Sequence, residues 1–127
     1  MVYIMKIIKE SRFRVSNLKQ HADKHHNQYI NDPRFKDAKT DDDFNKIYDE
    51  IGDKLSRKTV AKSDDVSRKN RYVGFIDKRK RRVKYDKQTE DFIVFAGPET
   101  ITLHKKTYDQ YKNILKRDFG SEFDYNK

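Results

Sequence analysis

Three of the four histidines in this chain, His21, His25 and His26, lie within six consecutive residues, and Lys24 stands among them. No proline or glycine interrupts the surrounding stretch, which predicts a helix over residues 17–30. Side chains three and four positions apart share a face of a helix, so His21 and His25 should project together with Lys24 at their flank. His26 is expected to point toward solvent and to be dispensable.

This cluster has the group types that acid and base catalysis requires. An imidazole titrates near neutral pH, so two histidines can supply a base and an acid, and activity should follow a bell centred near neutral pH. Two other interpretations stay open. One histidine could pack in the core while the others are solvated. Alternatively, His21 and His25 could bind zinc with His104, although the chain has no HExxH motif and no cysteine.

Thr102 and His104 form a second candidate group near the carboxyl end of the chain. Alternate residues of a strand share a face, so these two side chains should be presented together, while Ile101 and Leu103 face the other way. An exposed strand face with no function is the alternative. Added to the histidine helix, the pair completes the parts needed to cleave RNA by attack of its own 2′-hydroxyl, without a metal ion.

This chemistry assigns a role to each group. His25 or His21 should remove the proton from the 2′-hydroxyl, His104 should act as the acid or contact the substrate, and Lys24 should stabilise the phosphorane. One geometric condition applies. If the histidine helix packs on the Leu103 face of the strand, only a twisted or edge arrangement can bring His104 close to it.

The positive charge of the chain is concentrated in one segment. The 127 residues carry a net charge of +9, and residues 57–87 account for all of it, with 13 Lys and Arg against 4 Asp. Such asymmetry favours a polyanionic partner, most commonly nucleic acid, over a merely solvated basic loop. The candidate contacts are Lys62, Arg68, Lys69, Arg71, Lys78, Arg79, Lys80, Arg81, Arg82 and Lys84.

The remaining patterns predict an α+β fold, with N-terminal helices packed on a four-stranded antiparallel meander and a C-terminal helix, in one domain spanning residues 1–127. Thr40 should cap an amphipathic helix that continues past Leu55. Thr107 and Gln110 match a capping box, and Gly120 stands where a C-cap glycine would. Short alternating runs with short connections predict the antiparallel strands. These strands are expected over residues 71–77, 81–86, 92–96 and 100–105.

The N-terminal region is less determined. Residues 2–8 predict a short strand or the start of a helix, and residues 12–15 predict another short extended piece. Ser16 is the expected N-cap of the histidine helix, which should end before Pro33 because proline cannot continue it. No run is long and apolar enough to span a membrane, and no signal-peptide pattern is seen, so we expect no membrane partner and a cytoplasmic site of action.

The order of these motifs resembles the barnase/EndoU/colicin/RelE-type (BECR) nuclease superfamily, especially its small phage-borne and polymorphic-toxin members. The resemblance covers roughly residues 16–106. It implies a metal-independent ribonuclease that needs no cofactor, is directed at tRNA or another cellular RNA, and has a cognate immunity or antitoxin protein as partner. The motifs that carry the resemblance are His21-x-x-Lys24-His25, Phe35, Arg71-Tyr72-Val73-Gly74-Phe75-Ile76-Asp77, Val83-Lys84-Tyr85-Asp86, Thr89, Phe92-Ile93-Val94-Phe95 and Ile101-Thr102.

Carried over position by position, the resemblance implies that His21, Lys24 or His25 is catalytic and that Thr102 contacts a phosphate or a base. His104 stands where the family has an aromatic residue. Two functions from other classes remain. One is a non-catalytic nucleic-acid-binding protein, in which aromatic side chains stack on bases. The other is a phage or mobile-element protein that inhibits another protein. The stacking residues of the first alternative are Tyr72, Phe75 and Tyr85.

Overall fold

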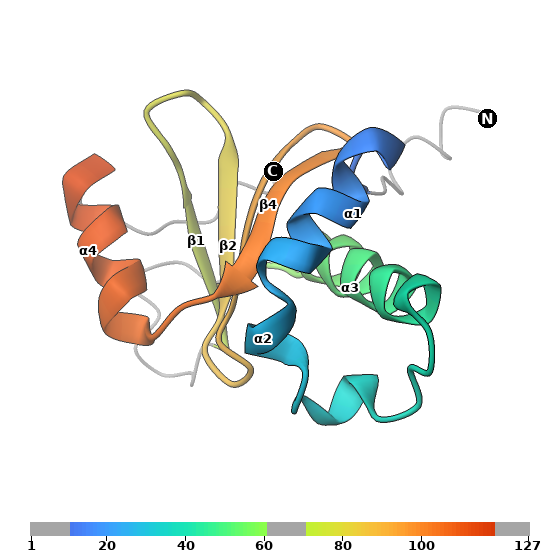
Figure 1. Cartoon of the computed structure of the whole chain (residues 1–127). Helices are drawn as coiled ribbons and strands as arrows, with labels where there is room; N and C mark the ends of the chain where they lie inside the picture. The colour runs from blue at the N-terminus through green and yellow to red at the C-terminus, as the bar shows by residue number, and fades with distance from the viewer. Residues whose placement is uncertain (1–10, 61–70, 119–127) are drawn as a thin grey trace, which may run out of the picture.

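A computed structural model describes residues 11–60 and 71–118 of the chain, and it has the expected α+β architecture. The sheet separates α4 on one side from α1 and α3 on the other (Figure 1). No helix in the described ranges is long and apolar enough to cross a membrane. The helical elements are α1 (Val15–Lys24), α2 (His26–Tyr29), the 3-10 turn η2 (Pro33–Phe35), α3 (Asp41–Ser56) and α4 (Tyr108–Asp118).

The four strands form an antiparallel meander in the order β1-β2-β3-β4, as the short connections predicted. Each strand begins and ends within one residue of its expected bounds. Consequently β1 and β4 are the two edges of the sheet, and β4 is the edge that α1 runs beside (Figure 1). The strands are β1 (Tyr72–Ile76), β2 (Arg82–Asp86), β3 (Asp91–Ala96) and β4 (Glu99–Lys105).

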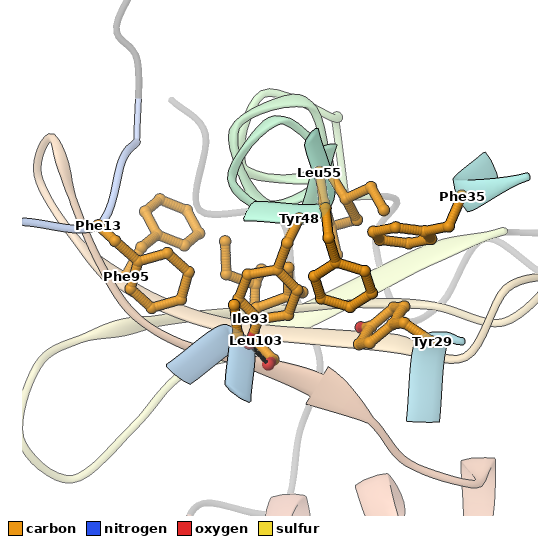
Figure 2. Close-up of a cluster of buried hydrophobic side chains, with 11 residues drawn as sticks. Phe13, Tyr29, Phe35, Tyr48, Leu55, Ile93, Phe95 and Leu103 are labelled. Carbon is orange, nitrogen blue, oxygen red and sulfur yellow. Dashed lines mark hydrogen bonds between the residues drawn. The ribbon is translucent and has the colours of Figure 1, made fainter. Parts of the chain in front are cut away.

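One face of the sheet carries an aromatic core beneath α3. Tyr48 reaches from α3 to the sheet, with Phe13 on one side of it and Tyr29 on the other (Figure 2). The Tyr48 ring stacks on Phe13 and meets Tyr29 edge-on, with both pairs of centroids 5.5 Å apart. Ile93 and Leu103 supply the sheet side of this core and are fully buried. Rings of this size bury enough apolar area to hold a polar chain in one fold.

The opposite face packs against α4 through a second core. Tyr111 and Leu115 from α4 lie on Val83, Tyr85 and other side chains of the sheet. The Tyr111 ring stacks on the Tyr85 ring with centroids 4.7 Å apart. The helix begins with the expected capping box, in which the amide of Thr107 donates to Gln110 and the amide of Gln110 donates to the Thr107 hydroxyl. Gly120, the expected C-cap, lies outside the described residues.

The histidine helix differs from its expected form in two ways. It is capped by Arg14 rather than Ser16, and the Arg14 side chain makes no capping hydrogen bond. It also breaks at His25, whose backbone leaves the helical conformation before α2 begins at His26. In a continuous helix the side chains of His25 and His26 would project about 100° apart. Because the helix breaks between them, this helical angle does not apply to the two imidazoles.

The other N-terminal expectations have mixed outcomes. Arg12 is extended and forms an isolated parallel bridge to Glu99, but the extended piece stops before Val15, which begins α1. The helix expected after Thr40 is confirmed as α3, with a complete capping box between Thr40 and Asp43. Residues 2–8 lie outside the described part of the chain.

Candidate functional site

The edge strand β4 carries one half of the candidate site. Thr102 pairs with Val94 and His104 pairs with Phe92, so both side chains lie on the α4 side of the sheet. The register shifts between Val94 and Phe95, and Ile101 packs against the α4 core instead of lying with Leu103. The expected pairing of Ile101 with Leu103 on one face is therefore wrong, because the irregularity adds a residue to β4 at this point.

The histidine helix supplies the other half across this edge. The His25 ring stacks on the His104 ring, with centroids 4.8 Å apart and planes inclined by 20°. His104 Nδ1 lies 3.2 Å from the hydroxyl oxygen of Thr102, within hydrogen-bonding distance. The structure thus brings His25, Thr102 and His104 together although Leu103 packs on the α3 side, because β4 is an edge strand and α1, which ends just before His25, runs beside it (Figure 1).

The stacked imidazoles lie in a surrounding that disfavours their protonation. Burial, together with the nearby charges of Lys106 and His25, lowers the pKa of His104 to about 3. Burial also lowers the pKa of His25, with Lys24 as the next contribution, while a hydrogen bond with Gln28 acts in the opposite direction. Both rings are therefore neutral at pH 7, and each can accept a proton.

His21 lies next to this stack rather than in it. Its ring stacks on Phe13 with centroids 4.9 Å apart, and its buried Nδ1 has no hydrogen-bond partner. Burial lowers the pKa of His21, and the charge of Lys24 lowers it further. Lys24 itself is exposed and is a cause of the lowered pKa of His21, His25 and His104 alike. Lys24 is therefore close to the histidines, as the sequence analysis expected.

Lys106 belongs to the same cluster and was missed by the sequence analysis. Its ammonium group lies 5.3 Å from the centre of the Phe92 ring, the ring that also contacts His104. Burial lowers the pKa of Lys106, and the charge of Arg117 lowers it further. The signal that could have found it is the alternation Thr102, His104, Lys106, continued one step past the end of β4.

His26 was expected to point toward solvent, but its side chain does not. Its ring is half-buried and packs against Phe44 of α3, with centroids 4.5 Å apart. The expectation assumed one continuous helix, whereas the helix breaks at His25, so the direction of the His26 side chain cannot be derived from that of His25. His26 thus joins α2 to α3 and takes no part in the stack of His25 and His104.

One of the expected nucleic-acid contacts is wrong. Lys84 is fully buried, and its ammonium group donates to the carbonyl oxygens of Ser56, at 2.7 Å, and Lys58, at 2.5 Å. It therefore ties β2 to the end of α3 and is not presented to a ligand. The proposed base-stacking role of Phe75 and Tyr85 is wrong for the same reason, because both rings are fully buried.

Several of the remaining basic residues form ion pairs, and Lys78 and Arg71 are both exposed and paired, since Lys78 lies 3.9 Å from Asp118. Arg71 forms an ion pair with Asp86 at 2.8 Å, and Arg81 forms one with Asp77 at 2.9 Å. Asp77 also accepts a hydrogen bond from the backbone amide of Arg79, and this bond helps to order the hairpin between β1 and β2. The exposed side chains of this hairpin are Lys78, Arg79, Lys80 and Arg82. Lys62, Arg68 and Lys69 lie outside the described residues.

Within residues 11–60 and 71–118, no group of three or more His, Cys, Asp or Glu side chains is arranged to hold a metal ion. Zinc binding by His21, His25 and His104 thus has no support in their arrangement. His25 and His104 present parallel ring faces to each other, whereas metal ligands direct nitrogen atoms at one common point.

No protein-family model, curated protein or solved structure matches this chain. The resemblance to the BECR nucleases therefore rests on the short motifs of the sequence. The chemistry of the site is inferred from the contacts, burial and charges of its own side chains.

Proposed function

We propose that this protein is a metal-independent endoribonuclease that cleaves RNA by attack of the substrate's own 2′-hydroxyl. The observation that carries the proposal is the stack of His25 on His104 at the β4 edge. Thr102 lies within hydrogen-bonding distance of His104, and Lys24 and Lys106 place positive charge near the stacked rings. A base, an acid and a cation are the groups that this reaction requires.

His25 is the better base of the pair. It is half-buried, and the lowering of its pKa leaves it neutral at pH 7. In the proposed step it takes the proton from the 2′-hydroxyl, the 2′-oxygen forms a bond to phosphorus, and the bond from phosphorus to the 5′-oxygen breaks. The products are a 2′,3′-cyclic phosphate and a free 5′-hydroxyl.

His104 is assigned a substrate contact rather than the role of acid. A pKa of about 3 leaves no proton to give at pH 7, which argues against the acid role. Its Nδ1 is engaged with Thr102, so the other ring nitrogen is the one that can hydrogen-bond to the phosphate. Thr102 is accordingly a positioning residue that fixes the orientation of the His104 ring.

Lys106 is the proposed acid, and Lys24 the proposed stabiliser of the phosphorane. An ammonium group whose pKa is lowered gives up its proton more readily than an ordinary lysine, and burial lowers the pKa of Lys106. Its proton goes to the leaving 5′-oxygen. Lys24 is exposed at the end of α1, where its charge can reach the equatorial phosphate oxygens without donating a proton.

The test is to incubate the protein with total RNA in excess EDTA and to identify the ends of any fragments. Fragments with 2′,3′-cyclic phosphate and 5′-hydroxyl ends are expected. Lys24→Ala should lower the rate, and Lys19→Ala is its matched control, because Lys19 is exposed on the same helix and pairs only with Asp23 among the described residues. Intact RNA, or fragments with 3′-hydroxyl ends, would contradict the proposal.

A second candidate function, RNA binding without cleavage, is favoured by the hairpin between β1 and β2. Arg79 and Lys80 are exposed at its turn, where Lys80 takes a left-handed backbone conformation. Under this alternative, affinity falls with salt, and it weakens in Arg79→Ala with Lys80→Ala but not in His25→Ala. A toxin or phage-type role, with an immunity or antitoxin partner, is supported only by the resemblance in sequence.

A further inference from the structure

A groove of about 740 Å³ lies between α3 and the β1 side of the sheet. This volume falls within the range of about 300–1,000 Å³ that is usual for small-molecule sites. The groove opens on the α3 side near β1, whereas His104 lies on β4, the opposite edge of the sheet. It is therefore separate from the candidate catalytic cluster.

The floor of the groove is apolar. Ile47, Ile51 and Leu55 follow one another every four residues along α3 and form one continuous row. Tyr72 from β1 faces them, partly exposed, and packs against the same core. A flat apolar group can therefore rest on aliphatic side chains with an aromatic ring at its margin.

The rim of the groove is basic. Lys46, Glu50 and Lys54 form a second row of the same spacing on α3, and Lys58 lies just beyond the end of that helix. The three lysines are exposed and line the groove. Among the described residues, neither Lys46 nor Lys58 has a carboxylate within ion-pairing distance. Lys54 is 3.9 Å from Glu50, and Glu50 is closer to Arg12, at 3.1 Å.

The acidic residues of the groove do not cancel this charge, because arginines already neutralise them. Asp86 is paired with Arg71 at 2.8 Å, and Asp91 with Arg34 at 2.7 Å. The lysine rim is thus the charge that a ligand meets. A ligand that fits must combine a planar apolar body with negative charge at its margin, which is the chemistry of a nucleotide.

We propose that the groove between α3 and β1 is a second, non-catalytic binding site for a nucleotide, with the base on the Ile47 floor and the phosphate on the lysine rim. The nucleotide could come from two sources that share this chemistry, a free mononucleotide or one residue of an RNA strand. Neither source requires that the protein cleave RNA.

The experiment is calorimetric titration of the full chain with four probes. These are adenosine 5′-monophosphate, adenosine, inorganic phosphate and a 2′-O-methyl adenylate hexamer. The hexamer lacks the 2′-hydroxyl nucleophile, so its binding is measured independently of the proposed catalysis. We expect the mononucleotide to bind at least about tenfold more tightly than adenosine or phosphate alone, because the site holds both parts.

The variant pair Lys46→Gln with Lys58→Gln tests the rim. It should weaken mononucleotide and hexamer binding by about tenfold or more, and lower the log–log salt slope for the hexamer by about 1.4, which is about 0.7 for each lost phosphate contact. Lys36→Gln with Lys39→Gln is the matched control, with the same change in charge on exposed lysines outside the groove. Tyr72→Leu should weaken the mononucleotide and leave phosphate binding unchanged.

The outcomes separate the sources. A hexamer no tighter than the mononucleotide indicates a free nucleotide, and a much tighter hexamer indicates an RNA strand, provided that the groove variants lose binding in either case. The proposal would be overturned if the wild type bound neither the mononucleotide nor the hexamer. Equal losses in the groove and control pairs, or phosphate binding as tightly as the mononucleotide, would also overturn it.

Discussion

The hydroxyl of Tyr48 donates a hydrogen bond to the carbonyl oxygen of Leu103, the residue between Thr102 and His104. This bond ties α3 to the edge strand through a fully buried side chain (Figure 2). An edge strand has neighbours on one side only, so such a tie limits its movement. It holds the backbone from which Thr102 and His104 project.

The first prediction concerns this tie. Tyr48→Phe should lower the free energy of unfolding by about 1–2 kcal/mol, because the buried carbonyl of Leu103 loses its donor while the ring packing stays. Urea denaturation measures the change. Unchanged stability would show that the bond does not hold the strand.

The second prediction separates a structural lysine from an exposed one. Lys84→Met should lower the free energy of unfolding by about 2–3 kcal/mol, because two carbonyl oxygens lose a charged donor. Lys80→Met is the matched control at the exposed hairpin turn and should leave stability within about 0.5 kcal/mol. Thermal melts of the two variants check this, and an equally stable Lys84→Met would contradict the structural role.

The third prediction follows from the lowered pKa of His104. Because burial and nearby positive charges lower it to about 3, the unfolded chain binds a proton there more readily below pH 6.5, and stability from this group is lost as the pH falls from about 6.5 toward 3. His104→Gln cannot titrate, so its unfolding free energy should decline less steeply over that window. Denaturation midpoints at a series of pH values test this, and parallel curves would show that the ring is not protected from protonation.

The fourth prediction concerns the pH dependence of the proposed cleavage. The lowered pKa of His25 moves the acid limb below pH 6.5, and the lowered pKa of Lys106 moves the alkaline limb below pH 10.5. The profile should therefore be displaced to the acid side at both limbs. Lys106→Arg should shift the alkaline limb upward, since a guanidinium group loses its proton only above about pH 12. An alkaline limb that stays in place would remove Lys106 from the role of acid.

The architecture was predictable because its signals are local. Thr40 with Asp43 and Thr107 with Gln110 mark helix starts by spacing alone, and both capping boxes are present. The strands were predictable because short alternating runs joined by two to five residues can pair only with their neighbours. The sequence could not place Lys84, because only the position of α3 over the sheet decides that its face is buried.

The candidate site was predictable in its members but not in its contacts. The contact between His25 and His104 depends on the break at His25 and on the course of α1 around the sheet edge. Neither is a local property of the sequence, since both result from packing between distant segments. The position of Ile101 depends in the same way on a register shift that alternation does not show.

The most direct test of the central claim is a double-mutant cycle on the stacked pair. Values of kcat/KM for cleavage of a short RNA in excess EDTA would be measured for His25→Ala, His104→Ala and the double variant, with His26→Ala as the control outside the stack. We predict that each single variant loses about 10²–10⁴-fold and that the double variant loses little more, because the two rings act as one unit. His26→Ala should stay within a few-fold of the wild type once it is folded. Losses that multiply, or full activity in both single variants, would contradict the account.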